Sequence, residues 1–145
     1  MEKRISKDEY YLGIAEAVLK RSTCLRRNYG AVLVKNDEII STGYNGSARG
    51  EANCIDTGVC IRQELGVPSG ERYELCVAVH AEQNAIISAG REKAIGSTLY
   101  IVGKEHGSED YASPEPCKIC KRFIKNAGIV RVVGIRNGIV EDIEI

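Results

Sequence analysis

The sequence has no excess of charge of either sign, since its 20 lysines and arginines balance its 20 aspartates and glutamates. A chain with this balance has no overall field that would draw it to nucleic acid or to a membrane surface. It also lacks a basic face rich in aromatic residues, which argues against an RNA-editing role. An anionic ligand must therefore be met by a local cluster of cations.

Long apolar runs, internal repeats and low-complexity tracts are absent as well. Charged residues occur throughout the first thirty or so positions, and no uninterrupted apolar stretch approaches the length of a signal peptide or a membrane span. We expect a cytoplasmic protein with no membrane partner. A chain of 145 residues fits one domain, residues 1–145, with a single core.

Turn residues and hydrophobic periodicity predict helices that alternate with strands. A capping box at Ser6 and Glu9 begins a helix that runs to about Arg21. A long loop over residues 47–74 contains a short helix near 61–65. The remaining expected helices are Val79–Ala89, stopped by Gly90, and one from Pro116, at a first helical position, to about Ala127, stopped by Gly128. The expected strands are Gly30–Val34, Glu38–Thr42, Thr98–Val102, Ile129–Ile135 and an antiparallel edge strand Ile139–Ile145. The pattern predicts an α/β sandwich in which about five strands are covered by three helices.

The six cysteines favour metal ligands, reactive thiols or small buried apolar residues over a disulfide framework, because no secretory signal is present. Two of them belong to the most informative pattern in the chain. His80-Ala81-Glu82 opens one expected helix, and Pro116-Cys117-Lys118-Ile119-Cys120 opens another. His80, Cys117 and Cys120 would supply one nitrogen and two thiolates, and a catalytic zinc uses three protein ligands with the fourth position left for water.

Glu82 lies two positions after His80, where its side chain can reach such a water without ligating the metal. Zinc lowers the pKa of bound water to about 7, so a nearby carboxylate can take its proton and pass it to a ring nitrogen or a leaving amine. H-x-E combined with P-C-x-x-C is the signature of zinc nucleobase deaminases. A purely structural zinc site would close the fourth position with another cysteine or histidine, so Glu82 argues against a non-catalytic zinc-stabilised binding module.

The sequence resembles the deoxycytidylate (dCMP) deaminase family along nearly its whole length. The matching stretches are Arg21–Cys24, Tyr29–Val34, Thr42–Gly46, His80–Ile86 and Pro116–Cys120. The resemblance implies a three-layer α/β/α cytidine-deaminase-like fold, with a mixed sheet and helices on both faces. It also implies hydrolytic deamination of dCMP to dUMP and ammonia, which feeds thymidylate synthesis.

By the same resemblance, Asn45 meets the substrate sugar, and the main chain at Ala81 and Glu115 reads the cytosine edge. A 5′-phosphate needs cationic or amide donors. The candidates are Arg26, Arg27 and Arg62, although each could equally belong to a solvated basic surface.

Two departures from the family pattern bear on the substrate. Residues 104–114 are inserted before the Pro-Cys segment and bring Glu105, His106 and Tyr111 near the expected pocket, where Tyr111 either stacks on a base or covers the core. Glu115-Pro116-Cys117 is also similar to adenosine and guanine deaminases. CMP, cytidine and guanine therefore remain alternative substrates.

The family commonly forms homo-oligomers, frequently hexamers, and many members respond to dCTP and dTTP through the Gly43–Gly46 loop. The resemblance therefore implies a homo-oligomer, a hexamer or a dimer, with nucleotide effectors. Four cysteines lie outside the catalytic motif and could hold a second, structural zinc or be reduced, buried thiols. These are Cys24, Cys54, Cys60 and Cys76.

Overall fold

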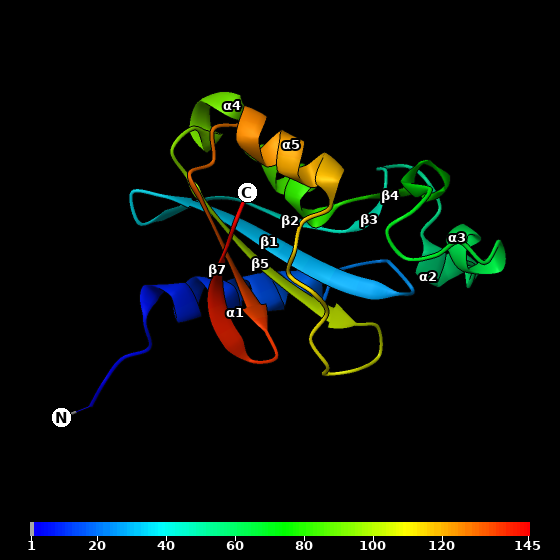
Figure 1. The fold of residues 1–145 in the computed structure, drawn as a ribbon, viewed down its shortest axis with the longest axis horizontal. Helices are drawn as coiled ribbons and strands as arrows, with labels where there is room; N and C mark the ends of the chain where they lie inside the picture. The colour runs from blue at the N-terminus through cyan, green and yellow to red at the C-terminus, as the bar shows by residue number, and fades with distance from the viewer. Residues whose placement is uncertain (1) are drawn as a thin grey trace.

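The structure, a computed structural model that describes residues 2–145, is built around a mixed five-stranded sheet (Figure 1). In spatial order the strands are β2 (Glu38–Tyr44), β1 (Arg27–Lys35), β5 (Thr98–Glu105), β6 (Arg131–Arg136) and β7 (Ile139–Ile143). The β5–β6 pair is parallel and the other neighbours are antiparallel. The predicted α/β class and mixed sheet are confirmed.

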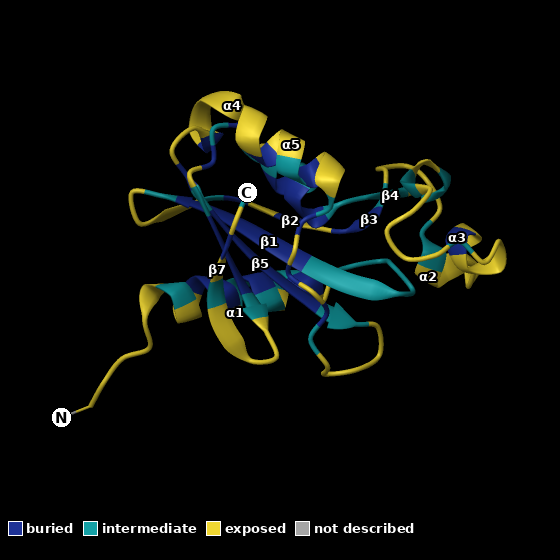
Figure 2. Cartoon of the chain, in the orientation of Figure 1, coloured by how far each residue is buried: buried dark blue, intermediate teal, exposed yellow. Residues whose placement is uncertain are grey.

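Helices cover both faces of the sheet. Helix α1 (Lys7–Leu19) lies on one face, while α4 (Ala81–Ala94) and α5 (Lys118–Asn126) lie on the other (Figure 1). Alternate strand residues face the two layers, so Leu33 and Leu99 pack with α4 and α5, whereas Val32 and Tyr100 pack with α1. Two apolar cores result, and the central strands are buried between them (Figure 2).

The first helix begins as the sequence indicates. The Ser6 hydroxyl accepts a hydrogen bond from the Glu9 amide at 3.1 Å, and the Glu9 carboxylate accepts one from the Ser6 amide, so the predicted capping box is confirmed. The helix ends at Leu19, two residues before the predicted end. It lies close to β1 because Gly30 has no side chain: a Cβ there would come within 2.1 Å of the Ala15 carbonyl oxygen.

Two hairpins join strands that the sequence predicts. Asn36 and Asp37 turn β1 into β2, and Asn137 and Gly138 turn β6 into β7, with positive φ at all four positions. Strand β7 is antiparallel and lies at the edge of the sheet, as expected.

The long segment between β2 and α4 lies beyond one end of the sheet (Figure 1). It contains β3 (Gly46–Ser47) paired with β4 (Ala78–Val79), two short helices, α2 (Cys54–Thr57) and α3 (Ile61–Glu64), and the 3₁₀ turn η1 (Tyr73–Leu75). Helix α3 is the short helix that the sequence predicts near 61–65. None of the helices within residues 2–145 has both the length and the apolar character needed to cross a bilayer.

The two helices that carry the zinc motif begin later than the sequence predicts. Helix α4 begins at Ala81 with His80 as its N-cap, and α5 begins at Lys118 with Cys117 as its N-cap, so Pro116 precedes the helix instead of opening it. Gly90 interrupts α4 with φ 75° and ψ 157°, but the segment resumes helical turns to Ala94. Gly128 has φ 79° and follows the last turn of α5, as predicted.

Candidate active site

The first turn of α4 is held directly against β2, and this contact places His80. A Cβ at Gly43 would come within 2.4 Å of the Ala81 carbonyl oxygen, so glycine is required for the approach. The Asn84 side-chain amide donates to the Tyr44 carbonyl at 2.8 Å, and the Gln83 side chain accepts from the His80 amide at 2.9 Å. His80 therefore leaves the helix start in a defined direction.

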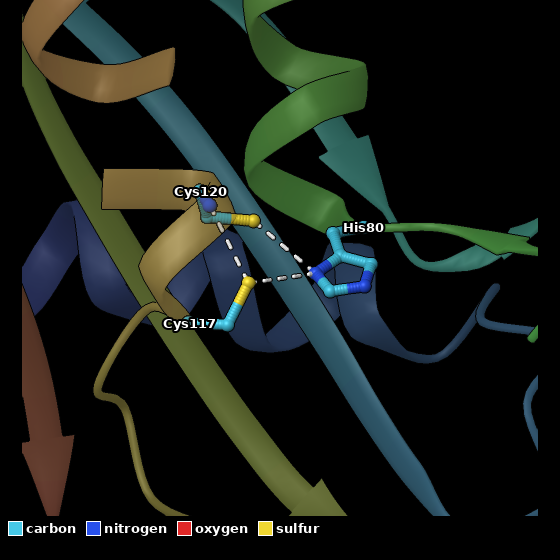
Figure 3. A group of neighbouring side chains, drawn as sticks. All are labelled: His80, Cys117 and Cys120. Atoms are coloured by element: carbon cyan, nitrogen blue, oxygen red, sulfur yellow. Dashed lines mark hydrogen bonds between the residues drawn. The ribbon is translucent and has the colours of Figure 1, made fainter. Parts of the chain in front are cut away.

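Helix α5 presents its two cysteines from its own first turn. The Cys117 thiol, at the N-cap, accepts a hydrogen bond from the Cys120 amide at 3.4 Å, and the Cys117 carbonyl accepts from the Lys121 amide at 2.9 Å. Both helix starts lie on the same face of the sheet, so the histidine and the cysteines meet (Figure 3).

His80, Cys117 and Cys120 have the geometry of a zinc ligand set. The His80 Nδ1 atom lies 3.1 Å from the Cys120 sulfur and 3.6 Å from the Cys117 sulfur (Figure 3). Tetrahedral zinc with ordinary bond lengths separates a nitrogen and a sulfur ligand by about 3.5 Å. Among residues 2–145, these three are the one group of three or more possible ligands whose atoms all lie within 4.8 Å of one another. The donors fit zinc in chemistry and in spacing.

The two thiols of this ligand set have different pKa values. A hydrogen bond from Cys120 lowers the pKa of Cys117 to about 4, and the same contact, with burial, raises the pKa of Cys120. The contact thus favours the thiolate form of Cys117, and a dication would favour loss of the proton from Cys120 as well.

Glu82 is buried beside this cluster, with 5% of its surface exposed. Burial raises the pKa of its carboxyl group, while the nearby His80 acts in the opposite direction. A carboxylate whose pKa is raised accepts a proton more readily, which is what a general base near neutral pH requires.

A cleft opens in front of these residues, between the N-terminal end of β1 and the segment 60–78. It brings together most of the residues predicted to meet a substrate. The predicted residues that line it are Cys24, Arg26, Arg27, Asn45, Cys60, Arg62, Cys76, His80, Ala81, Glu82, Glu115 and Cys117.

Asn45 is fixed by its own hydrogen bonds. Its side-chain oxygen accepts from the Tyr29 amide at 2.9 Å and from the Ser22 hydroxyl at 2.5 Å, and its side-chain nitrogen donates to the Arg27 carbonyl at 2.9 Å. These contacts leave one amide hydrogen for a ligand.

The three arginines differ in what holds them. Arg27 is paired with Glu105 at 3.2 Å and donates to the Ser69 hydroxyl. Arg62 is 93% buried and donates to the carbonyls of Pro68 and Glu71. No hydrogen bond or ion pair of the Arg26 side chain occurs among the described residues, which leaves its cation available to a ligand in the cleft.

The structure does not bring Tyr111 to the cleft. Its ring packs against the core on the α1 side, 5.4 Å from the Lys104 ammonium group, which is the position expected of a residue that covers the core. The inserted segment turns this residue away because Tyr111 bridges back to Lys104 along β5. Glu105 reaches the rim of the cleft through Arg27, and His106 contacts Asn28 at 3.1 Å.

The four remaining cysteines are free thiols in one region of the molecule. Burial raises the pKa of Cys54, and the proximity of Cys24, Cys60 and Cys76 raises it further. In the described part of the chain these four sulfurs do not approach one another as closely as the His80 cluster does. Cys54 itself lies outside the cleft, in an adjoining hollow with Cys60 and Cys76.

Two tyrosines of the cleft are not among the predicted site residues. Tyr29 lines it from β1, and its hydroxyl donates to the Ser113 carbonyl at 2.8 Å. Tyr73 lines it from the irregular segment. Tyr29 belongs to the stretch Tyr29–Val34 that resembles the family pattern, which could have drawn attention to it, but a residue of an aperiodic loop such as Tyr73 carries no such signal.

Comparison with known proteins agrees with this geometry. Residues 5–135 match the family described as cytidine and deoxycytidylate deaminase zinc-binding region. The chain is 44% identical over 131 residues to a deoxycytidylate deaminase of Mycobacterium phage D29, covering 87% of this chain and 91% of that protein. It is 37% identical over 130 residues to a deoxycytidylate deaminase of Schizosaccharomyces pombe, covering 90% of this chain but 37% of that longer protein.

Solved structures show the same fold. The dCMP deaminase of the cyanophage S-TIM5 in its apo form aligns with a TM-score of 0.62 at 27% identity, covering 92% of this chain and 86% of that one. Its complex with dCMP and dUMP aligns with a TM-score of 0.61 at 28% identity, covering 90% and 83%. The chain belongs to the cytidine and deoxycytidylate deaminase family.

Proposed function

We propose that this protein is a zinc-dependent hydrolase that converts dCMP to dUMP and ammonia. The observation that carries the proposal is a buried carboxyl group, Glu82, beside a ligand set of His80, Cys117 and Cys120, at the base of a cleft that contains arginines. The names of the phage and yeast relatives support the same substrate.

In this mechanism Glu82 moves the protons. Zinc, when bound by His80, Cys117 and Cys120, supplies a water of lowered pKa beside the carboxylate. Glu82 would take one proton from the attacking water and deliver it to the pyrimidine ring nitrogen, and would then take the second proton from the added hydroxyl and deliver it to the departing amine. A carbon–oxygen bond forms at the ring carbon, the carbon–nitrogen bond to the amine breaks, and the products are a carbonyl and ammonia. Burial of Glu82 keeps bulk water from competing for these protons.

The remaining residues of the cleft orient the substrate in this proposal. Asn45 offers its one remaining amide hydrogen to the sugar, and the main chain at Ala81 and Glu115 meets the cytosine edge. The 5′-phosphate is met by arginine. Arg26 is the best placed for this role, because Arg27 is paired with a glutamate and Arg62 is engaged by two carbonyls.

A substrate panel tests the proposal. The zinc-loaded protein is assayed for ammonia release with dCMP, CMP, deoxycytidine, cytidine, guanine and adenosine. We expect the highest kcat/KM with dCMP. Faster turnover of guanine or adenosine would replace dCMP with a purine substrate, and no turnover of any compound would favour a zinc-stabilised binding module.

We further propose that the protein assembles as a homo-oligomer through the outer faces of α4 and α5. Ile87 is 72% exposed and Phe123 is 47% exposed on these helices, and both faces are open in the single chain (Figure 2). Light scattering of the purified protein measures the size of the assembly. Regulation by dCTP and dTTP rests on the family resemblance, and kinetics with each nucleotide added test it.

A further inference from the structure

His80 has an unusual environment for a zinc histidine. Its Nδ1 atom faces the two sulfurs, and its other ring nitrogen points away from them (Figure 3). A histidine that binds metal ordinarily donates its second ring N–H to a carboxylate, a carbonyl or water, and this contact fixes the plane of the ring. Within residues 2–145, no protein group makes a hydrogen bond to the Nε2 atom of His80.

An aromatic ring packs against the His80 imidazole. The rings of Tyr73 and His80 meet edge to face, with centroids 5.4 Å apart and planes at 79°. This arrangement is the favoured one for two aromatic groups, and it restricts rotation of the imidazole. Both residues line the cleft.

Tyr73 is in turn held by Arg62. The Arg62 guanidinium lies 4.7 Å from the centroid of the Tyr73 ring, in a cation–π contact. Two hydrogen bonds fix the guanidinium, from Nε to the Glu71 carbonyl at 3.1 Å and from Nη2 to the Pro68 carbonyl at 3.0 Å. The residues that anchor Arg62 thus belong to the same segment that carries Tyr73.

We propose that Tyr73, braced by Arg62, is a positioning residue for the metal ligand His80. The contacts among Arg62, Tyr73 and His80 hold the imidazole plane in the orientation that directs Nδ1 at the two cysteine sulfurs. They therefore couple folding of residues 60–76 to the affinity of the site for zinc. The inference rests on His80 being a zinc ligand, as in the proposed function, but it requires no substrate.

The chain contains two histidines, and this allows a direct measurement. Protein grown with histidine labelled with ¹³C at Cε1 alone gives one ring signal per histidine, and that of His106, which contacts Asn28 away from the metal ligands, serves as the internal control. Zinc-loaded protein is titrated with a competing chelator until half of the His80 signal has changed to the zinc-free position. Because the signal belongs to His80, zinc held by other cysteines does not affect the result.

We expect Tyr73→Leu to lower the midpoint chelator concentration about tenfold, the lower end of the loss seen when the outer contact of a metal ligand is removed. Tyr73→Phe keeps the ring and should match the parent protein. An unchanged midpoint in Tyr73→Leu, or an equal shift in Tyr73→Phe, would overturn the proposal.

The variant Arg62→Lys provides a second test of the proposal if Tyr73→Leu does not fold. Lysine keeps the charge but loses the planar guanidinium that stacks on the ring. We expect its midpoint to fall about threefold, while Arg26→Lys, the matched change at an arginine outside these contacts, leaves it unchanged. Equal midpoints for the two lysine variants would overturn the role of Arg62. If the chelator never alters the His80 signal of the parent protein, the assignment of His80 as a zinc ligand and this inference are both wrong. If the variants shift the midpoint but the parent protein is inactive on dCMP, only the proposed function is wrong.

Discussion

The residues that line the cleft differ in burial and in the contacts that their side chains make. Glu82 and Glu115 both line it, but Glu82 is buried beside the metal ligands, whereas Glu115 forms an ion pair with Lys121 at the surface. The two carboxylates therefore differ in chemistry even though both lie within reach of the same ligand. This difference provides a matched pair of variants.

We expect Glu82→Gln to reduce kcat on dCMP by about a hundredfold or more, because an amide cannot accept the proton of water. Zinc content and melting temperature should stay close to those of the parent protein, since the amide is nearly isosteric with the carboxyl group. Ammonia release and elemental analysis of the same sample measure both quantities. Glu115→Gln, whose proposed contact uses the main chain, should change kcat little, and near-normal activity of zinc-loaded Glu82→Gln would refute the assignment.

Arg26 governs the preference for a phosphate in our proposal. We expect kcat/KM for dCMP to exceed that for deoxycytidine by more than about tenfold, because one charge-assisted contact contributes about 1.5–3 kcal/mol. Arg26→Gln should remove most of this ratio and leave the activity on deoxycytidine unchanged. Arg122→Gln, on the outside of α5, is the control. Equal turnover of nucleoside and nucleotide by the parent protein would contradict a phosphate site.

At the scale of elements, the first turns of two helices and the irregular segment form different parts of the site. Helices α4 and α5 present the metal ligands from their first turns, and their positions follow from close packing on the sheet. The segment between β2 and α4 forms the opposite wall of the cleft with little regular structure of its own. Its organisation must come from side-chain contacts such as those of Arg62, or from its thiols.

We propose that Cys24, Cys54, Cys60 and Cys76 bind a second zinc ion that ties this segment to the start of β1. The closeness of the other three thiols to Cys54 supports the proposal, although the four sulfurs must move together to reach one ion. Elemental analysis of protein purified without added metal should return about two zinc ions per chain, and about one for Cys54→Ser, since a tetrahedral site needs four ligands. A value of one in the parent protein would identify the four cysteines as reduced thiols.

At the scale of the whole molecule, an ion-pair network closes the fold by joining α1 to β6. Arg131 donates two hydrogen bonds to Asp8, at 3.0 and 2.9 Å, and the Tyr100 hydroxyl donates to the same carboxylate at 2.7 Å. These contacts, led by that of Arg131, hold the pKa of Asp8 below its ordinary value. A carboxyl group whose pKa is lowered on folding stabilises the protein above its unfolded pKa, and this contribution is lost as pH falls through the folded pKa.

Asp8→Asn should therefore lower the melting temperature at pH 7 by about 3 °C, which corresponds to about 1 kcal/mol for a partly exposed pair. The difference between variant and parent should begin to shrink below about pH 4, as the carboxyl of the unfolded state is protonated, and should vanish once pH falls below the folded pKa of Asp8. Thermal melts of both proteins at each pH measure this difference in melting temperature. The pH dependence that comes from the metal site is common to both proteins and cancels in the difference. Asp142→Asn, at the exposed end of the same network, should shift the melting temperature less. A difference that persists unchanged at low pH would show that Asp8 acts through packing.

Much of the fold and of the metal site could be predicted from the sequence because the signals are local. The short apolar runs of β1 and β5, the turn residues Asn137 and Gly138, and the cap at Ser6 act through neighbours in the chain, and each predicted element is present. The ligand set of His80, Cys117 and Cys120 is likewise defined by residue type and by spacing at two helix starts. Helix boundaries were less accurate, since His80 and Cys117 are N-caps and each helix begins only after them.

Tertiary structure alone decided which residues of irregular segments share the cleft. Tyr111 was drawn onto the α1 face by its bridge to Lys104, and Tyr73 was brought to His80 by the fold of residues 60–76. Arg62 was directed partly into its own loop, a role that its charge did not indicate. The sequence by itself determined the sheet, the helices and the chemistry of the metal ligands, because these depend on short-range periodicity and residue type. The surroundings of those ligands depend on contacts between distant parts of the chain, which only three-dimensional packing establishes.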